Sequence, residues 1–333
     1  MKGLVVHGVL FAVASGLALT IWSRDETAVE AGGEDKVEVW GGSAESITHL
    51  DFESPKLTLS LDAKKDAIGR YYLVKVDREE AKAPHGGPDA GAPPPGKRET
   101  SQFIGVKAAD ELVQKLAPFS ALRRIGPFEP GRAEEFGLDK PEGTLKVKLG
   151  GGEQSLVLGS NTPGGQERYA RHVASNTVYA IESEVAQSLL AGDSRLLERE
   201  LHGFTDAEVT RIRITRAGKS REVVPVPEKK GSWADAATPA NADQTVANWL
   251  GKVERLRLSE YVEKPAQPIT PESLVTRIEY FGGAKALGHL ELYAVPGEKG
   301  NDYLARTEYT RWYVKVASSS AEQVDQDLAG LLK

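Results

Sequence analysis

The chain has 333 residues, of which 40% are hydrophobic and 27% are charged, a composition typical of a globular body with room for two or three domains. Its net charge of −6 argues against a nucleic-acid-binding protein, because such proteins usually carry a basic footprint. The absence of cysteine excludes disulfides, thiolate nucleophiles and cysteine-ligated metals.

The first element along the chain is an apolar run over residues 3–22. A helix of this length extends about 30 Å, which matches the hydrocarbon core of a bilayer. A cleaved signal peptide is the competing interpretation, since Ala12-Val13-Ala14 fits the small-residue cleavage rule. We expect an uncleaved membrane anchor over residues 1–24 and an acidic tether over residues 25–36. Either interpretation places the rest of the chain outside the cytoplasmic membrane.

The segment after the tether predicts three strands and a helix. Alternating apolar and polar residues indicate strands at 47–52, 57–61 and 71–76. A helical pattern runs from Ala109 to Arg124. Between them, residues 79–100 are rich in proline, glycine and alanine and cannot bury enough surface to offset ordering. We therefore expect a disordered loop there.

Residues 137–171 carry the clearest local pattern in the chain. Two strands joined by the glycine turn Gly150-Gly151-Gly152 are followed by a second strand pair and an amphipathic helix. These elements are predicted, in order, at 145–149, 156–158, 168–172, 177–181 and 182–191.

The same order of elements recurs in the second half. Strands are predicted at 209–214, 222–226 and 232–233, a helix at 242–257, strands at 275–280, 290–293, 302–306 and 312–316, and a closing helix at 319–332. Ala109-Asp110 recurs 133 residues later as Ala242-Asp243, and Ala170-Arg171 recurs 135 residues later as Ala305-Arg306. Two motif pairs with nearly the same offset favour a duplication in the order A–B–A′–B′. Chance similarity of common strand–helix patterns is the alternative.

The predicted fold is therefore α+β, with antiparallel sheets and short helices packed on one face. We expect two related lobes, covering residues 37–200 and 201–333. The proline-rich residues 265–271 separate the two parts of the second lobe, and residues 128–141 play the same part in the first.

No pattern identifies a catalytic, cofactor or metal site. The six histidines form no i, i+4 pair, and the HExxH and GxSxG motifs are absent. Ala217-Gly218-Lys219-Ser220 lacks the earlier glycine of a phosphate loop and is interpreted as a hairpin turn. We therefore predict a protein that is not an enzyme and uses no cofactor.

Polar and aromatic strand residues are the candidates for an interaction surface. They are Tyr169, Arg171, Tyr303, Arg306, Arg211 and Arg213. The first four occupy matching places in the two halves, and they could instead pack or cap strand edges. The last two put positive charge on one strand face, together with Arg216 through the turn, which would suit an acidic partner. A solvated face is the alternative for them.

Several motifs in a fixed order resemble a bacterial domain family of unknown function. They are GLDKP, LGSNTPGGQERYAR, VYAI and LLERELHGF, followed by Trp233, Pro239, Ala242 and Asp243, and the resemblance covers roughly residues 40–265. Members of that family typically carry one N-terminal membrane helix. Their genes often lie beside a gliding-motility-type ABC transporter permease and its substrate-binding-like auxiliary protein. The family has no established active site, so the resemblance implies no catalytic residue.

We therefore expect a non-catalytic, membrane-anchored extracytoplasmic accessory or scaffold subunit associated with a gliding-motility-type ABC transporter complex. It would lie in the bacterial inner membrane as a single-pass protein with its main body in the periplasm. The expected partners are the lipid bilayer, through residues 3–22, and membrane or auxiliary subunits of the transporter.

The alternative function is a periplasmic module that binds a small molecule or glycan in the cleft between the lobes. It predicts a lining drawn from Trp233, Trp249, Tyr303 or Trp312. An enzyme whose carboxylates are brought together by the fold is the third hypothesis.

Overall fold

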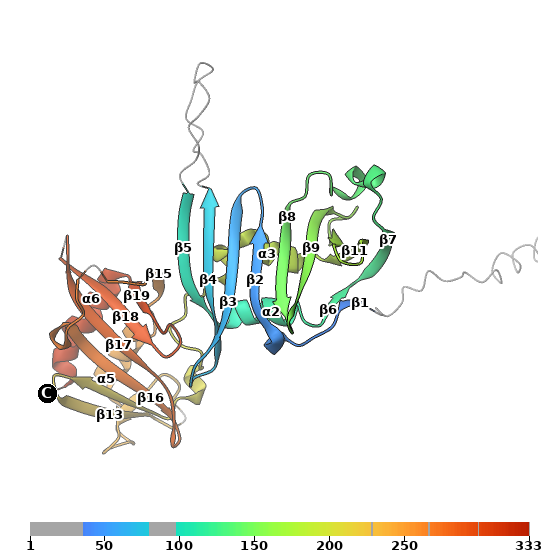
Figure 1. Cartoon of the computed structure of the whole chain (residues 1–333). Helices are drawn as coiled ribbons and strands as arrows, with labels where there is room; N and C mark the ends of the chain where they lie inside the picture. Colours follow the sequence, from blue (N-terminus) through green and yellow to red (C-terminus); the bar gives the residue numbers. More distant parts are fainter. Residues whose placement is uncertain (1–35, 80–97, 228, 266, 299, 333) are drawn as a thin grey trace, which may run out of the picture.

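The computed structural model describes residues 36–79, 98–227, 229–265, 267–298 and 300–332 (Figure 1). The predicted membrane helix over residues 3–22 lies outside the described residues, as do the tether apart from Lys36 and the interior of the predicted loop. The ends of that loop, Glu79 and residues 98–100, belong to strands. In the part of the chain that is described, no helix is both long enough and apolar enough to cross a bilayer.

The first half folds into a nine-stranded antiparallel sheet with the order β5-β4-β3-β2-β8-β9-β10-β11-β7, accompanied by a two-stranded sheet, β1-β6. The strands are β1 (Val37–Trp40), β2 (Ile47–Glu53), β3 (Leu57–Lys65), β4 (Arg70–Glu79), β5 (Arg98–Gly105), β6 (Phe119–Ala121), β7 (Arg123–Pro127), β8 (Gly143–Leu149), β9 (Gly152–Asn161), β10 (Glu167–His172) and β11 (Thr177–Glu182). The helices are α2 (Lys107–Gln114), α3 (Ser183–Ala191) and α4 (Asp193–Leu196). We call this half the first lobe.

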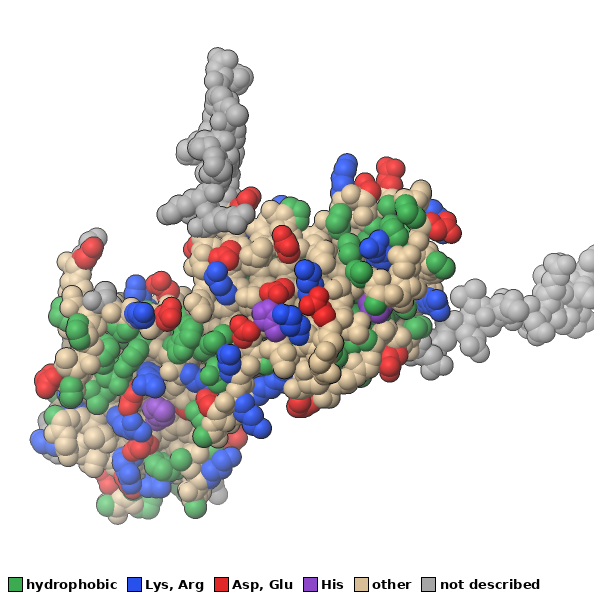
Figure 2. Space-filling model, in the orientation of Figure 1, with side chains coloured by type: hydrophobic (Ala, Val, Ile, Leu, Met, Phe, Trp, Pro, Cys, Tyr) green, Lys and Arg blue, Asp and Glu red, His purple; other side chains and the backbone are tan. Residues whose placement is uncertain are grey.

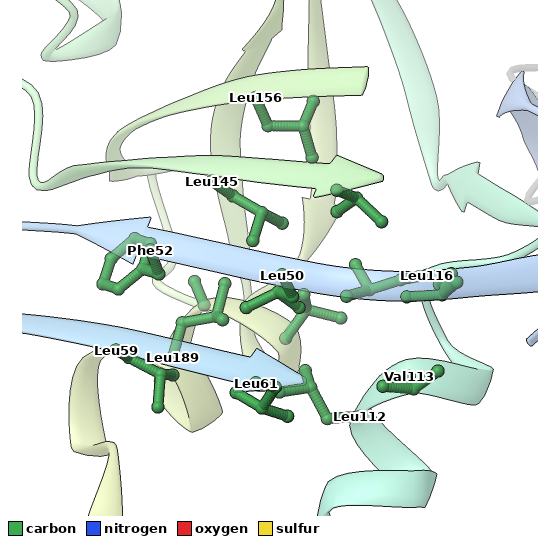
Figure 3. Packing of buried hydrophobic residues seen from close by; sticks show 14 of the residues in the cluster. Leu50, Phe52, Leu59, Leu61, Leu112, Val113, Leu116, Leu145, Leu156 and Leu189 are labelled. Atoms are coloured by element: carbon green, nitrogen blue, oxygen red, sulfur yellow. The ribbon is translucent and has the colours of Figure 1, made fainter. Parts of the chain in front are cut away.

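Strict alternation along the strands builds the first core. Leu50 and Phe52 of β2, like Leu59 and Leu61 of β3, are at most 1% exposed, whereas the residues between them face the other side. Figure 3 shows these side chains meeting the apolar faces of α2 and α3. The helices therefore cover one face of the sheet and leave the opposite face without a helix (Figure 1).

The second half, which we call the second lobe, forms an eight-stranded antiparallel sheet with the order β14-β13-β12-β16-β17-β18-β19-β15. Its strands are β12 (Arg211–Arg216), β13 (Lys219–Pro225), β14 (Trp233–Asp235), β15 (Leu258–Val262), β16 (Leu274–Gly282), β17 (Lys285–Gly297), β18 (Gly300–Thr307) and β19 (Tyr313–Val316). Its helices are α5 (Gln244–Val253) and α6 (Ser318–Leu331). Trp249 of α5 is 1% exposed, and its indole Nε1–H donates to the Val324 carbonyl of α6 at 2.9 Å, which ties the two helices together.

The two sheets share the order of eight strands. The series β4-β3-β2-β8-β9-β10-β11-β7 of the first corresponds step by step to the whole second sheet, and β5 is the additional edge strand of the first. A short 3-10 helix with a capping box precedes both β2 and β12, at Ala44–Ser46 and Asp206–Glu208, and a third such box precedes β16. The predicted α+β class, with antiparallel sheets and short helices, is confirmed.

Two predicted helices are shorter in the structure than the sequence pattern suggested. The run from Ala109 to Arg124 is helical only to Gln114, and β6 and β7 follow. Pro118 explains this end, because proline lacks an N–H and disfavours helical backbone in the residue before it. The run 242–257 likewise ends as a helix at Val253.

The predicted linkers connect strands of a single sheet. β2 pairs directly with β8, and β12 pairs directly with β16, so the A and B parts of each half share one sheet and one core. Residues 128–141 contain two 3-10 turns, η2 (Pro130–Arg132) and η3 (Glu134–Phe136). Residues 265–271, of which residue 266 lies outside the described part, lead into η5 (Pro271–Ser273).

Candidate interaction surface

The helix-free face of the first sheet is polar and carries both signs of charge. Strand register places Lys75, Ser60, Asp51 and Lys146 side by side on β4, β3, β2 and β8. Opposite charges directly across neighbouring strands stabilise such a face. Figure 2 shows charged side chains spread over the helix-free face of each lobe.

His49 lies between two carboxylates on this face. Its Nδ1 is 2.8 Å from Asp62 Oδ1 and its Nε2 is 2.8 Å from Asp51 Oδ2. Burial lowers the pKa of His49, but the hydrogen bonds and charges of the two aspartates outweigh it and raise the pKa overall. Among the described residues, no group of three or more His, Cys, Asp or Glu side chains is arranged to hold a metal ion.

The predicted basic surface on β12 is compensated by acidic neighbours. Arg213 Nη2 contacts Glu222 Oε1 at 2.7 Å, and Arg211 Nη1 contacts the same oxygen at 3.1 Å. These hydrogen bonds, that from Arg213 first, lower the pKa of Glu222. Arg211 also lies over the Phe281 ring at 4.0 Å, and Glu279 is 3.7 Å from Arg213. The two arginines thus share a helix-free face with the carboxylates that neutralise them.

Arg216 does not lie on that face. It is five residues from Arg211, an odd number, and alternation turns it to the other side of the sheet. There its guanidinium contacts Asp325 of α6 at 3.2 Å. The expectation that the three arginines share one face is corrected for Arg216.

The expected match between Tyr169/Arg171 and Tyr303/Arg306 holds only for the arginines. Ala170 and Ala305 are both fully buried. Arg171 and Arg306 each follow one of these alanines and lie on the helix-free side. Tyr303 is two residues before Ala305 and shares its core face, whereas Tyr169 is adjacent to Ala170 and faces the other way.

The surroundings of these four residues differ accordingly. Tyr303 is 4% exposed and its hydroxyl donates to Asp325 Oδ2 at 3.2 Å, so it belongs to the second core and not to an exposed surface. Tyr169 packs edge-on against Phe136 at 5.1 Å, and Arg171 lies over Phe128 at 4.5 Å. Arg306 is exposed and lies 5.7 Å from the Tyr313 ring centre.

The aromatic residues expected to line a cleft between the lobes are dispersed. Trp249 and Tyr303 are core residues. Trp312 packs edge-on against Tyr261 at 6.4 Å, where the two lobes meet. Trp233 lines a cavity inside the second lobe. Three of the four, Trp233, Trp249 and Tyr303, are buried inside the second lobe, so they do not form the lining that the alternative function requires.

Five side chains that the sequence did not single out connect the two lobes; we call them the clamp. They are Asp66, Glu198, Tyr261, Tyr309 and Arg311. Arg311 binds Asp66 through two hydrogen bonds, Nε–Oδ2 at 2.7 Å and Nη2–Oδ1 at 3.2 Å, and lies 4.3 Å from the Tyr71 ring centre. The hydrogen bond from Arg311 is the main cause that lowers the pKa of Asp66 to about 2.

Glu198 joins the lobes at the start of α2. Its carboxylate accepts hydrogen bonds from the backbone N–H groups of residues 106, 107 and 108 at 3.0–3.3 Å, so it caps the helix from outside. The same carboxylate accepts the Tyr309 hydroxyl at 2.7 Å. Tyr261 of β15 donates to the Ile104 carbonyl of β5 at 3.3 Å. The clamp therefore fixes the second lobe against the β5 edge of the first.

Glu198 lies within the motif LLERELHGF, so the sequence contained a signal for it but not for its partners. Arg311 and Asp66 are 245 positions apart, and neither belongs to a recognisable motif. Arg311 also has a φ of 58°, an unusual conformation for a residue other than glycine, which no local pattern indicated.

Two antiparallel sheets, each with helices on one face only and joined to each other by partly buried polar contacts, define an α+β protein. Residues 105–274, just over half of the 333-residue chain, match the family described as Domain of unknown function (DUF4340), and the chain belongs to that family. The match begins at the end of β5 and ends at the start of β16, so it includes parts of both sheets. No curated protein and no solved structure matches the chain.

Proposed function

We propose that this protein is a non-catalytic, membrane-anchored accessory or scaffold subunit of a gliding-motility-type ABC transporter complex. The apolar residues 3–22 would anchor it in the bacterial inner membrane, with the two lobes in the periplasm. The family resemblance, the length of that apolar run and membership of the DUF4340 family support the proposal.

The observation that carries the proposal is the clamp. A scaffold must hold its binding faces in a fixed relation, and here an ion pair, a helix cap and two tyrosine hydroxyls join the lobes. In Figure 1 the helices of both lobes lie behind their sheets, which turns both helix-free faces to the same side. Those broad faces, rather than a deep active-site cleft, suit contact with another protein.

We further propose that the two lobes arose by duplication of one α+β unit. The shared order of eight strands and the capping box before β2 and β12 support this origin. Superposition of the eight corresponding strands is the test: the helices α3 and α6 must then fall on the same side of the common sheet.

Affinity purification of the full-length chain from membranes, extracted in a mild detergent, tests the scaffold function. We expect transporter membrane or auxiliary subunits to co-purify. A charge-reversed variant of the helix-free face, Lys75→Glu with Lys146→Glu, should lose them. The matched control, Glu111→Lys on the exposed side of α2, should keep them. A chain that is recovered in the soluble fraction, or that brings down no membrane protein, contradicts the proposal.

A further inference from the structure

A cavity of about 210 Å³ lies inside the second lobe, between α5, the sheet and the segment that enters the lobe. Its lining divides by exposure into a floor and a rim. The floor is buried and apolar or aromatic: Leu201, Val209, Ile212, Trp233, Leu250, Val253, Leu256, Tyr280 and Leu290. The rim contains exposed charged residues: Glu200, Asp206, Glu254 and Arg257.

The rim is acidic, and two of its carboxylates lack partners. Arg257 is its one cation, and the guanidinium is already hydrogen-bonded to the backbone carbonyls of residues 254 and 256 at 2.6 and 2.9 Å. The side-chain carboxylates of Glu254 and Asp206 make no hydrogen bond or ion pair with any described residue. They are close enough to repel each other, and the charge of Arg255 offsets only part of this at Glu254. Partial burial, and then the charge of Asp206, raise the pKa of Glu254.

The wall of the cavity also holds an unsatisfied polar atom. His202 Nδ1 is 3.0 Å from Glu308 Oε1, whereas its Nε2 is buried and has no hydrogen-bond partner among the described residues. The His202 ring packs against Phe204 at 4.7 Å and Tyr280 at 4.8 Å, which makes one side of the cavity aromatic. Buried polar atoms are normally hydrogen-bonded, so this nitrogen is available to a ligand.

We propose that this cavity binds a compact organic cation, an ammonium or guanidinium group carried on a short apolar body. The cation lies at the rim beside Glu254 and Asp206, and the apolar body enters the floor beside Trp233. Aromatic faces add to the attraction for a cation. The site lies within the second lobe alone, and it does not depend on the scaffold function.

The size of the cavity limits the occupant. Pockets for drug-sized ligands are usually about 300–1,000 Å³, so a cavity of about 210 Å³ accepts a small molecule or a single side chain. Two kinds of occupant carry a cation on a short apolar body: a free arylalkylamine, and the lysine or arginine side chain of a partner segment.

Binding of three probes to the purified full-length chain tests the proposal by NMR and calorimetry at pH 7. The probes are phenethylamine, its neutral isostere 2-phenylethanol, and acetyl-Gly-Arg-Gly-amide, in which only the side chain can enter. We expect at least one cationic probe to bind and the neutral isostere to bind several-fold more weakly. Binding of the free amine alone identifies a small-molecule site, and tighter binding of the peptide identifies a partner side chain.

Variants of the rim locate the site. Glu254→Gln and Asp206→Asn change exposed residues while keeping their shape, and each should weaken the binding of the cation by about fivefold. The matched control Glu111→Gln, on the exposed side of α2, should bind as the unmodified chain does. Equal binding of 2-phenylethanol and phenethylamine, unchanged affinity in both rim variants, or no binding of any probe at millimolar concentration overturns the proposal.

Discussion

The clamp should hold the two lobes in one relative position, and Arg311→Gln tests this because it removes the charged guanidinium and keeps a polar, uncharged side chain. The pKa of Asp66 falls from 3.8 to about 2 mainly through its hydrogen bond to Arg311. At about 1.36 kcal/mol per pKa unit, this difference sets a ceiling of about 2.5 kcal/mol. The Asp66 side chain is 33% exposed, so solvent screening should reduce the net contribution to about 1 kcal/mol.

Two measurements distinguish the loss of this one interaction from increased motion between the lobes. In urea unfolding, a double-mutant cycle of Arg311→Gln with Asp66→Asn should give a coupling energy of about 1 kcal/mol. The chain has no native cysteine, so Glu111→Cys on α2 and Glu322→Cys on α6 provide two sites for spin labels. The distance distribution between the labels should be narrow in the parent and broader in Arg311→Gln.

The control is Arg132→Gln, which breaks an exposed ion pair with Glu135 inside the first lobe and should leave the label distances unchanged. The reasoning also predicts a pH dependence. The folded pKa of Asp66 lies below the unfolded value, so its contribution is present above about pH 4 and is lost as the pH falls through about 2. A coupling energy of zero together with an unchanged distance distribution in Arg311→Gln would refute the role of the clamp.

Three further predictions concern the first lobe. NMR titration should place the pKa of His49 above 6.5 and the pKa of His172 below 6.5, and Asp62→Asn should lower only the pKa of His49. Because the folded pKa of His49 is raised, the stabilisation from its two aspartate partners is present below pH 6.5 and is lost as the pH rises through the folded pKa. Glu198→Ala should cost about 1–2 kcal/mol in urea unfolding and speed amide hydrogen exchange in the first turn of α2, and unchanged exchange there would argue against the cap. Leu50→Ala should destabilise the chain by about 2–5 kcal/mol, because Leu50 is fully buried at the centre of the sheet; a loss under about 1 kcal/mol would contradict the packing in Figure 3.

Strands with a strict two-residue period could be predicted from the sequence, and those without it could not. β8 and β9 alternate around the turn at Gly150 and Gly151, whose φ values of 55° and 86° explain the need for glycine. β7 begins with two arginines that continue a helical pattern. As an edge strand it needs little apolar alternation, so its sequence does not indicate a strand. β5 follows a proline-rich segment, and its first residues are polar.

The candidate surface was predicted only in part, because strand faces depend on register. A one-residue difference separates Tyr303, in the core, from Tyr169, on the helix-free side, and the two sequences around them look alike. The charges of Arg211 and Arg213 were visible, but their neutralisation by Glu222 requires the pairing of β12 with β13. The clamp depends on tertiary contacts that no local pattern encodes.

The extra strand β5 has a consequence for how the two lobes meet. Ile104, which receives the Tyr261 hydroxyl, belongs to β5, the strand with no counterpart in the second sheet. The two lobes therefore meet through unlike surfaces, with edge strand β15 of the second sheet against edge strand β5 of the first. At the corresponding end, the second sheet stops at β14, which is three residues long. The contact between the lobes thus depends on a strand that only the first sheet has, so the two sheets cannot exchange roles in it.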